Sequence, residues 1–270
     1  MEISLVTDEV SQDFETAIEL GCEWGIRNFE LRSAFFKRVP DISSEEVQRI
    51  VQTIKKYRVN ITAISPGLFK IPFKREELRN HLEVLLPESF RLAEKLGANM
   101  LLVFGMVRRK DERREEIIPK IVDILGKAAK RAQKEGIILA LENEDICWVD
   151  TGKNTAQIIK MVNSPSLRVN WDPGNAFGFG EEPYPGGYNY VKDYIINVHI
   201  KDALIEGKTN SKKYVVLGEG SINWNSQIKA LKKDGYKGHL SIETHVSPKV
   251  KSSYRCYQWL KGVLNETKEG

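Results

Sequence analysis

The chain has little cysteine, with three residues among 270, at Cys22, Cys147 and Cys256. They lie far apart in the sequence and form no CxxC pair, which excludes a disulfide framework and a thiolate zinc site. Sparse and unpaired cysteine is typical of a reducing compartment. We therefore expect a cytoplasmic protein.

Long hydrophobic runs are also absent. No window approaches the roughly 18 apolar residues that a membrane-spanning helix needs. The N-terminal stretch MEISLVTDEVSQDF carries acidic residues where a signal peptide needs basic ones. We therefore expect neither a membrane partner nor export.

An excess of charge of one sign is lacking as well. Lysine and arginine number 41 and aspartate and glutamate 37, which leaves a formal net charge of +4. Nucleic-acid-binding proteins usually carry a basic stripe or patch. The run from Arg108 to Glu116 mixes both signs, as a solvated segment does. No nucleic-acid partner is expected.

The sequence has no GxGxxG after its first aliphatic run and no P-loop. These absences argue against a doubly wound dinucleotide-binding sheet, the competing α/β architecture. Short aliphatic runs instead alternate with longer amphipathic runs throughout, which is the pattern of a parallel α/β fold. We predict a single domain, residues 1–270, folded as a (β/α)8 TIM barrel. The predicted strands are Ile3–Asp8, Asn28–Arg32, Ile61–Ser65, Met100–Gly105, Ile138–Glu144, Leu167–Asp172, Ile196–Lys201 and Leu240–Thr244.

Between the strands, apolar residues recur at three- and four-residue spacing, which predicts helices. The sixth unit differs, because the stretch GFGEEPYPGGYN after Asp172 reads as a long loop before a brief helix at Tyr190–Ile195. Long loops in compact domains are often functional, so we expect this one to form a lid over the strand ends. The main predicted helices are Ser44–Tyr57, Glu76–Leu96, Glu115–Glu135 and Trp224–Asp234.

Acids and a histidine occur at the carboxyl ends of the last four predicted strands, where (β/α)8 barrels carry their active sites. Side chains alternate along a strand, so the apolar residues that face the helices turn their neighbours into the barrel. Unpaired inward carboxylates are costly to bury, and a group of them indicates a shared ligand. The inward residues are Glu142, Asp172, His199 and Glu243.

Three carboxylates and one imidazole form an oxygen-rich set of ligands. Such a set suits Mn²⁺, Mg²⁺ or Co²⁺ better than a structural zinc, whose sites prefer sulfur and nitrogen. We therefore predict one divalent metal ion held by these four side chains. Mn²⁺ is the first choice, and Mg²⁺, Co²⁺ and Zn²⁺ are the alternatives.

Three further residues share the inward faces and are candidates for substrate binding. Lys201 lies two residues past His199 and could stabilise an enolate oxygen or hold a phosphate or carboxylate, unless it is a solvated lysine at the rim. His245 could donate to a substrate hydroxyl or simply cap the eighth strand. Arg32 ends the second strand beside Glu30, and an ion pair between these two is the alternative interpretation.

The loops above the barrel mouth supply two more candidates. Asn175, within DPGNA, could bind substrate, or it could shape a turn or cap a helix. Trp148 is a candidate wall for one face of a sugar, together with Phe177 and Phe179.

The segments LALENE, VNWDPGNA, NVHIKDA and LSIETH resemble the metal-binding strand ends of the xylose-isomerase-like sugar phosphate isomerase/epimerase superfamily. The resemblance covers nearly the whole chain. In that superfamily the ketose 3-epimerases and inosose dehydratases hold a metal with a Glu, Asp, His and Glu set on the fifth to eighth strands. Carried over by motif, the set is Glu142, Asp172, His199 and Glu243, and the resemblance makes Glu142 and Glu243 the catalytic acid and base.

The resemblance implies an enzyme that isomerises or epimerises a sugar, sugar phosphate or sugar acid through an enediolate. A dehydratase acting on a keto-sugar, inosose or dehydroshikimate-like substrate is the alternative, because an enolate can also expel a β-hydroxyl group. From a different class, the chain could be a non-catalytic barrel that binds a sugar. A homo-oligomer is compatible with each of these interpretations.

Two departures from the superfamily patterns narrow the prediction. Ketose 3-epimerases place a further glutamate and an arginine near the fifth and seventh strands, where this chain has Trp148 and the aliphatic segment Ala203–Ile205. This difference argues against a free ketohexose as substrate. The endonuclease IV branch needs a three-zinc cluster with about five histidines, and this chain has four histidines. An abasic-site nuclease is therefore the least favoured function.

Overall fold

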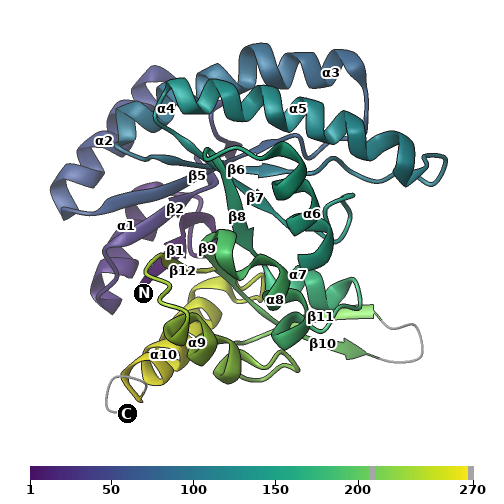
Figure 1. Cartoon of the computed structure of the whole chain (residues 1–270). Coiled ribbons are helices and arrows are strands. Elements are labelled where there is room, and N and C mark those ends of the chain that lie inside the picture. The colour runs from purple at the N-terminus through teal and green to yellow at the C-terminus, as the bar shows by residue number, and fades with distance from the viewer. Residues whose placement is uncertain (207–210, 267–270) are drawn as a thin grey trace.

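The computed structural model describes residues 1–206 and 211–266, and it confirms the predicted (β/α)8 barrel as a single domain. Eight parallel strands close in the order β1-β12-β9-β8-β7-β6-β5-β2, and helices surround them (Figure 1). The barrel strands are β1 (Glu2–Val6), β2 (Asn28–Leu31), β5 (Asn60–Leu68), β6 (Met100–Phe104), β7 (Ile138–Glu142), β8 (Leu167–Trp171), β9 (Ile195–Ile200) and β12 (His239–Ile242).

The inside of the barrel is layered by side-chain chemistry. A small apolar cluster of Ala63, Met100, Leu102 and Ala140 fills its lower part. Above it lies a layer of buried polar side chains, in which the amide of Asn197 donates to other lumen residues. This alternation follows the predicted strand parity, with the apolar residues of the opposite parity packed against the helices. The polar layer forms the floor of the mouth.

Helix ends follow local capping signals. In α2 (Ser44–Tyr57), the Ser43 side chain accepts from the backbone N–H of Glu46, and the Glu46 carboxylate accepts from the N–H of Ser43. The other helices are α1 (Phe14–Trp24), α3 (Arg75–Asn80), α4 (Leu86–Leu96), α5 (Arg114–Lys134), α6 (Gly152–Val162), α7 (Pro173–Gly178), α8 (Tyr188–Val191), α9 (Trp224–Lys233) and α10 (Lys249–Glu266). None of the helices within the described residues is long and apolar enough to cross a membrane.

Several boundaries differ from the sequence-based prediction. The helix predicted over Glu76–Leu96 is α3 and α4 joined by a π-helical turn at His81–Leu85. The first strand ends at Val6, because Thr7–Glu9 form a 3-10 turn that brings two acids to the mouth. Strand β5 runs on to Leu68.

The segment predicted to be a loose lid is largely folded. Helix α7 begins directly after Asp172, and a π-type turn at Pro183–Gly187 leads into α8. The carboxylate of Glu181 accepts a hydrogen bond from the backbone N–H of Gly152 at 2.7 Å, which fastens the segment to the start of α6. The predicted brief helix thus begins at Tyr188 rather than Tyr190, and it packs beside α6 in the layer of helices around the barrel.

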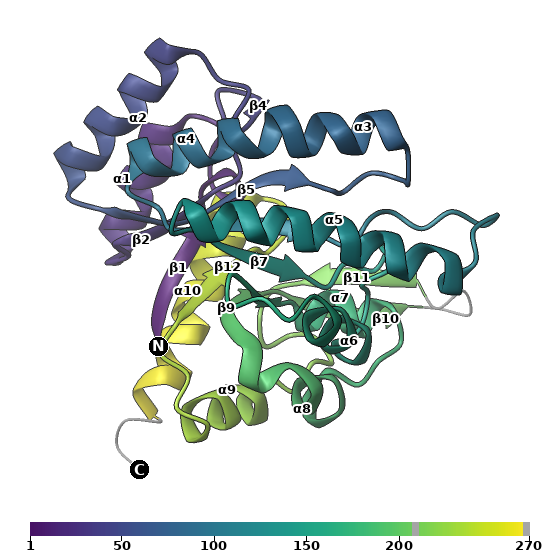
Figure 2. The same cartoon turned by 45° about the horizontal axis from the view of Figure 1, so that its top comes forward.

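Two antiparallel hairpins were not predicted. The first, β3 (Ser33–Ala34) with β4 (Lys37–Arg38), follows β2. The second, β10 (Asp202–Glu206) with β11 (Ser211–Val215), follows β9 and lies beside α7 (Figure 2). Both leave the carboxyl ends of barrel strands, so both belong to the mouth.

Candidate metal centre

The four predicted ligand residues come together at the barrel mouth. Glu142 ends β7, Asp172 follows β8, His199 lies in β9 and Glu243 follows β12. Each offers one ligand atom, and these atoms all lie within 4.8 Å of one another. The four residues are between 0% and 5% exposed, so the group is buried at the bottom of the mouth.

The imidazole of His199 is oriented by a carboxylate from the opposite part of the barrel. Its Nε2 lies 3.1 Å from both carboxylate oxygens of Glu30, a fully buried residue of β2. Its Nδ1 has no hydrogen-bond partner among the described residues and lies 3.2 Å from Oε2 of Glu243. Burial lowers the pKa of His199, but the negative charges of Glu30 and Glu142 outweigh it and raise the pKa well above its ordinary value.

Asp172 presents one oxygen to the same space. Its Oδ1 accepts from the backbone N–H of Asn175 at 2.9 Å, which caps α7. Its Oδ2 accepts no hydrogen bond of normal geometry, and its described charged neighbours there are Nζ of Lys201 at 2.6 Å and the His199 imidazole at 3.8 Å. Burial and the charge of Glu142 raise the pKa of Asp172, although Lys201 opposes this.

This donor set fits a divalent cation. Nδ1 of His199 has no hydrogen bond among the described residues and faces the three carboxylates, with the ligand atoms of all four residues within 4.8 Å of one another. Such buried groups are costly unless a partner takes them up. Three carboxylates with one imidazole suit a hard or borderline divalent ion, and Glu30 would fix the ring that presents Nδ1.

The two glutamates have different surroundings. Glu142 accepts from neutral amides, Nδ2 of Asn170 at 3.1 Å and Nδ2 of Asn175 at 3.3 Å. Glu243 faces cations instead, with Nζ of Lys201 at 2.7 Å and Arg32 in direct contact. Burial raises the pKa of Glu243, but the charges of Lys201 and His199 lower it well below its ordinary value. The pKa of Glu142 is also lowered, since the charge of His199 outweighs burial.

Lys201 lies in the mouth, as its strand parity predicted. It is 2% exposed, and its ammonium group bridges Asp172 and Glu243. Tyr214 of the second hairpin covers it, with the ammonium 5.6 Å from the ring centroid. The interpretation as a solvated rim lysine is therefore wrong, because β10 and β11 close over this side chain.

Arg32 also lies in the mouth, but its predicted alternative pairing is wrong. It forms ion pairs with Asp8, Glu9 and Glu243 rather than with Glu30. The reason is depth, since Glu30 lies two residues further into the barrel, at the level of the His199 ring.

His245 reaches the cluster from just beyond β12. Its Nδ1 lies 3.0 Å from Oε1 of Glu9 and its Nε2 lies 3.5 Å from Oε1 of Glu243. Its side chain is 29% exposed, and its ring packs against Tyr214 with centroids 5.1 Å apart. The position lets His245 face both the cluster and the open mouth.

Of the two loop candidates, Asn175 contacts the cluster and Trp148 contacts other residues. Asn175 donates its backbone N–H to Asp172, the residue that caps α7, and donates from its side-chain amide to Glu142. Trp148 is 7% exposed, and its indole N–H donates to Glu112 at 3.3 Å. The guanidinium of Arg108 lies over both Trp148 and Phe179. Trp148 therefore packs within the loops, a position that strand alternation could not predict.

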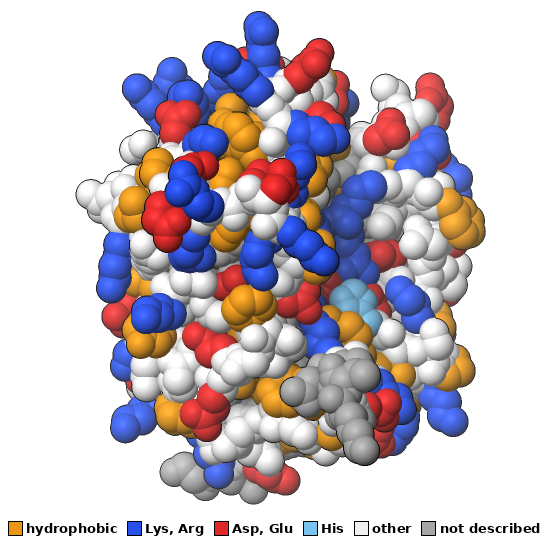
Figure 3. All heavy atoms as spheres, turned by 90° about the vertical axis from the view of Figure 1, so that its right-hand side faces the viewer, with side chains coloured by type: hydrophobic (Ala, Val, Ile, Leu, Met, Phe, Trp, Pro, Cys, Tyr) orange, Lys and Arg blue, Asp and Glu red, His pale blue; other side chains and the backbone are white. Residues whose placement is uncertain are grey.

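The face that carries the hairpin β10–β11 is hollowed. Figure 3 shows lysine, arginine, acidic and histidine side chains together in this hollow. Residues that sequence reasoning missed or left without a role at this mouth are Asp8, Glu9, Glu30, Arg38, Asn143, Glu144 and Tyr214. Strand alternation already places the side chain of Glu30 inside the barrel, so its role could have been predicted. Tyr214 belongs to a hairpin that no turn motif in the sequence indicates.

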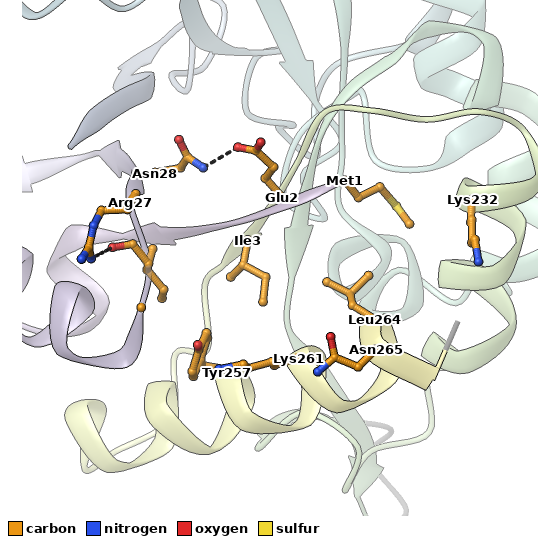
Figure 4. A pocket seen from close by; sticks show the side chains of 12 residues that line it. Met1, Glu2, Ile3, Arg27, Asn28, Lys232, Tyr257, Lys261, Leu264 and Asn265 are labelled. Carbon is orange, nitrogen blue, oxygen red and sulfur yellow. Dashed lines mark hydrogen bonds between the residues drawn. The ribbon is translucent and has the colours of Figure 1, made fainter. Parts of the chain in front are cut away.

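Two surface cavities lie apart from the cluster. One, of about 420 Å³, opens where β1 and β2 begin, beside α10, and Figure 4 shows Ile3, Tyr257 and Leu264 around it. There the amide of Asn28 donates to Glu2 at 2.7 Å. The other, of about 540 Å³, lies between the segment 177–184 and Ile205. The first is at the amino ends of the strands, opposite to where barrel active sites lie.

Comparison with known proteins adds a family and a range of activities. A family model described as "Xylose isomerase-like TIM barrel" matches residues 18–262. An Escherichia coli (strain K12) protein named "Putative L-ribulose-5-phosphate 3-epimerase SgbU" is 25% identical over 204 residues, which cover 73% of this chain and 71% of that protein.

The fold is shared with solved structures of several proteins. The probable 3-DHS dehydratase AsbF from Bacillus anthracis, involved in petrobactin synthesis, superposes with a TM-score of 0.80 at 17% identity, over 97% of this chain and 99% of the other. The IOLI protein, solved with a binding zinc atom, gives a TM-score of 0.78 at 20% identity, over 98% of this chain and 97% of the other. At sequence identities this low, the similarity shows a common fold alone.

Proposed function

This chain belongs to the xylose isomerase-like TIM barrel family, and on that premise we propose that it is a divalent-metal-dependent enzyme that isomerises or epimerises a small sugar, sugar phosphate or sugar acid. The observation that carries the proposal is the convergence of Glu142, Asp172, His199 and Glu243. In particular, Nδ1 of His199 has no hydrogen bond among the described residues and faces the three carboxylates of that buried group.

The four residues would hold one divalent ion, with Mn²⁺ as our first choice and Mg²⁺, Co²⁺ or Zn²⁺ as alternatives. When bound, such an ion would polarise a substrate carbonyl and the neighbouring hydroxyl, which makes the proton between them more acidic. The relative solved with zinc supports a divalent ion in this fold.

Glu142 and Glu243 are the proposed acid and base. They belong to β7 and to the end of β12, with β8 and β9 between them in the barrel, so they can approach a substrate from different sides. Glu142 is held by neutral amides and retains more basicity than Glu243, which faces Lys201 and Arg32. We therefore assign the first proton removal to a carboxylate oxygen of Glu142.

Lys201 and His245 are the proposed substrate-binding residues beside the acid and base. The buried ammonium of Lys201 can donate to an oxygen that gains negative charge as the proton leaves. His245, at the edge of the mouth, can donate to a substrate hydroxyl. Tyr214 and the backbone of its hairpin keep water from this part of the site.

The test is hydrogen exchange at the substrate. Keto-sugars, their phosphates and keto-acids are incubated in D₂O with Mn²⁺-loaded protein, and deuterium uptake next to the carbonyl is followed by NMR. We expect uptake for at least one substrate and a fall of about 10²- to 10⁴-fold in Glu142→Gln and Glu243→Gln. Glu19→Gln, the same change at an exposed position of α1 away from the cluster, serves as a matched control.

The products distinguish the two enzyme classes. Mass spectrometry shows no mass change apart from deuterium if the protein is an isomerase or epimerase, and loss of water if it is a dehydratase like the named B. anthracis relative. Full turnover or undiminished exchange in both glutamate variants would contradict the acid and base assignment.

A further inference from the structure

Arg38 differs from the other basic residues around the mouth. Arg32, Lys201 and Lys70 each pair with at least one carboxylate. Across residues 1–206 and 211–266, no carboxylate forms an ion pair with Arg38. Its hydrogen bonds go to Ser65, from Nε to the backbone oxygen at 2.7 Å and from Nη2 to Oγ at 3.1 Å. The guanidinium is thus held in place and its charge is not neutralised by contact.

The hairpin β3–β4 determines where Arg38 lies. Arg38 pairs with Ser33, the first residue of the hairpin, directly after Arg32 at the end of β2. Ser65 belongs to the neighbouring barrel strand β5. A Cβ built on Gly67, whose φ is +77°, would lie 3.7 Å from Nη2 of Arg38, so the guanidinium rests on bare backbone. The side chain is therefore anchored across two strand ends on the mouth face.

Arg38 also lies within electrostatic reach of the cluster. Burial of the guanidinium and the positive charge of Arg32 lower the pKa of Arg38. The charges of Asp8, Glu142 and Glu243 act in the opposite direction, with that of Asp8 the largest. The contacts with Ser65 place Arg38 beside the carboxyl-terminal half of β5, on the mouth face that also holds the cluster, where the rest of a bound substrate would extend. Protein atoms surround much of the guanidinium, but the residue still has solvent-exposed surface, so a ligand can reach it.

We propose that Arg38 binds an anionic group of the substrate, so that the substrate is a keto-sugar phosphate or a keto-sugar acid rather than a neutral sugar. This inference rests on the proposed function and narrows its substrate class. A guanidinium presents parallel N–H donors that match phosphate and carboxylate oxygens. Because Nε and Nη2 are engaged by Ser65, the donors of Nη1 and the second N–H of Nη2 remain for the anion.

The alternative is that Arg38 only fastens the hairpin to β5 through Ser65. The two roles make different predictions, since a fastening residue affects stability and all substrates alike. An anion-binding residue affects charged substrates selectively.

The experiment compares Arg38→Ala and Arg38→Lys with Lys37→Ala, a matched control that removes one positive charge from the same hairpin strand. Lys37 is directed to Glu46 on α2, at 3.0 Å. Deuterium exchange in D₂O is measured for matched substrate sets: a ketose, its terminal phosphate ester and the corresponding keto-sugar acid. Inorganic phosphate binding to the metal-loaded protein is measured by calorimetry.

We expect kcat/KM for the favoured anionic substrate to fall about 10- to 100-fold in Arg38→Ala, mainly through KM, and less in Arg38→Lys. Phosphate affinity should fall in parallel, while Lys37→Ala keeps both. The ester and acid arms show which anion is bound. Exchange of the neutral ketose as fast as the anionic forms, or equal losses for all substrates in Arg38→Ala, would overturn the assignment but leave the proposed function standing.

Absence of exchange with every substrate would instead count against the proposed function. In that case phosphate binding still decides the role of Arg38. Equal phosphate affinity in Arg38→Ala and Lys37→Ala would overturn the anion-binding role of Arg38. Phosphate bound by the metal alone would have the same affinity whichever residue stands at position 38.

Discussion

At the scale of single residues, the mouth is a network of carboxylates that share a few cations. Arg32 contacts Asp8, Glu9 and Glu243 at once, and Glu9 is completely buried. Removing one member of such a network leaves another charge unpaired, which is costly in a buried place. Glu9 therefore contributes to stability although it is not one of the candidate ligands.

Glu9 makes the stability of the fold depend on pH. Burial raises its pKa, but the hydrogen bond and charge of His245 and the charge of Arg32 lower it from 4.5 to about 2. The folded protein thus favours the ionised form. The resulting stabilisation is fully present above pH 4.5 and is lost as pH falls towards 2.

We expect the unfolding free energy of the native protein to fall, relative to Glu9→Gln, by up to about 3 kcal/mol across that window. Urea unfolding at pH 6, 4.5 and 3.5 covers the upper part of the window, where about 1.4 kcal/mol of this loss is expected. Glu19→Gln, at an exposed position of α1, is the control and should leave the difference constant with pH. A pH-independent difference for Glu9→Gln would show that its carboxylate is not held as the contacts indicate.

Strand alternation predicted most of the inward residues, because one buried face fixes the parity of a strand. It placed Lys201 and His245 in the mouth as well as the four candidate ligands. It could not assign partners, and so it paired Arg32 with Glu30, whose carboxylate instead contacts the ring of His199. Contacts between residues that are far apart in sequence depend on depth in the barrel, which a single strand pattern does not encode.

At the scale of elements, the two hairpins complete the mouth. One carries Arg38 and the other carries Tyr214 over Lys201. The sequence gives little sign of the first, because its two-residue turn consists of Phe35 and Phe36. Both have positive φ, 55° and 60°, in a turn where asparagine and glycine are the usual residues. Turn chemistry therefore could not have predicted it.

Because of the positive φ of Phe36, we predict that replacing this residue with glycine stabilises the folded protein. Phe36 is 88% exposed, so it contributes little packing, while a bulky side chain in the left-handed region is unfavourable. Phe36→Gly should raise the unfolding free energy by about 0.5–1 kcal/mol, since glycine adopts that conformation freely. Urea unfolding measures the change. Tyr190→Gly, at a half-exposed helical position in α8, is the control and should destabilise the protein, because glycine is unfavourable within a helix.

At the scale of the whole molecule, the barrel brings together residues from the two ends of the chain. Glu30 of β2 holds the His199 ring, and Glu9 holds His245, because closure places β1 beside β12 and β2 next to β1. The alternation of strand and helix patterns was enough to predict this closure, since it is repeated eight times. The helical turns after Asp172 could not be predicted, because this segment is rich in glycine and proline, as loops are.

A metal bound at the cluster would join four strands and should stabilise the whole barrel. A ligand that binds only the folded state at a free concentration about 100 times its Kd adds about 2.7 kcal/mol. For a chain of this size we expect Tm to rise by about 5–10 °C on addition of Mn²⁺ to chelator-treated protein. Differential scanning calorimetry measures the shift, and Mg²⁺, Co²⁺ and Zn²⁺ are compared in the same way.

Glu30→Gln tests whether that stabilisation comes through His199. Glutamine keeps the size of Glu30 but loses the carboxylate that orients the imidazole at 3.1 Å. Loss of such an orienting partner typically weakens metal binding about 10- to 100-fold, so the Tm rise at the same Mn²⁺ concentration should fall to about half or less. An undiminished rise would place the ion away from His199, and no rise with any of the four metals would contradict the metal centre itself.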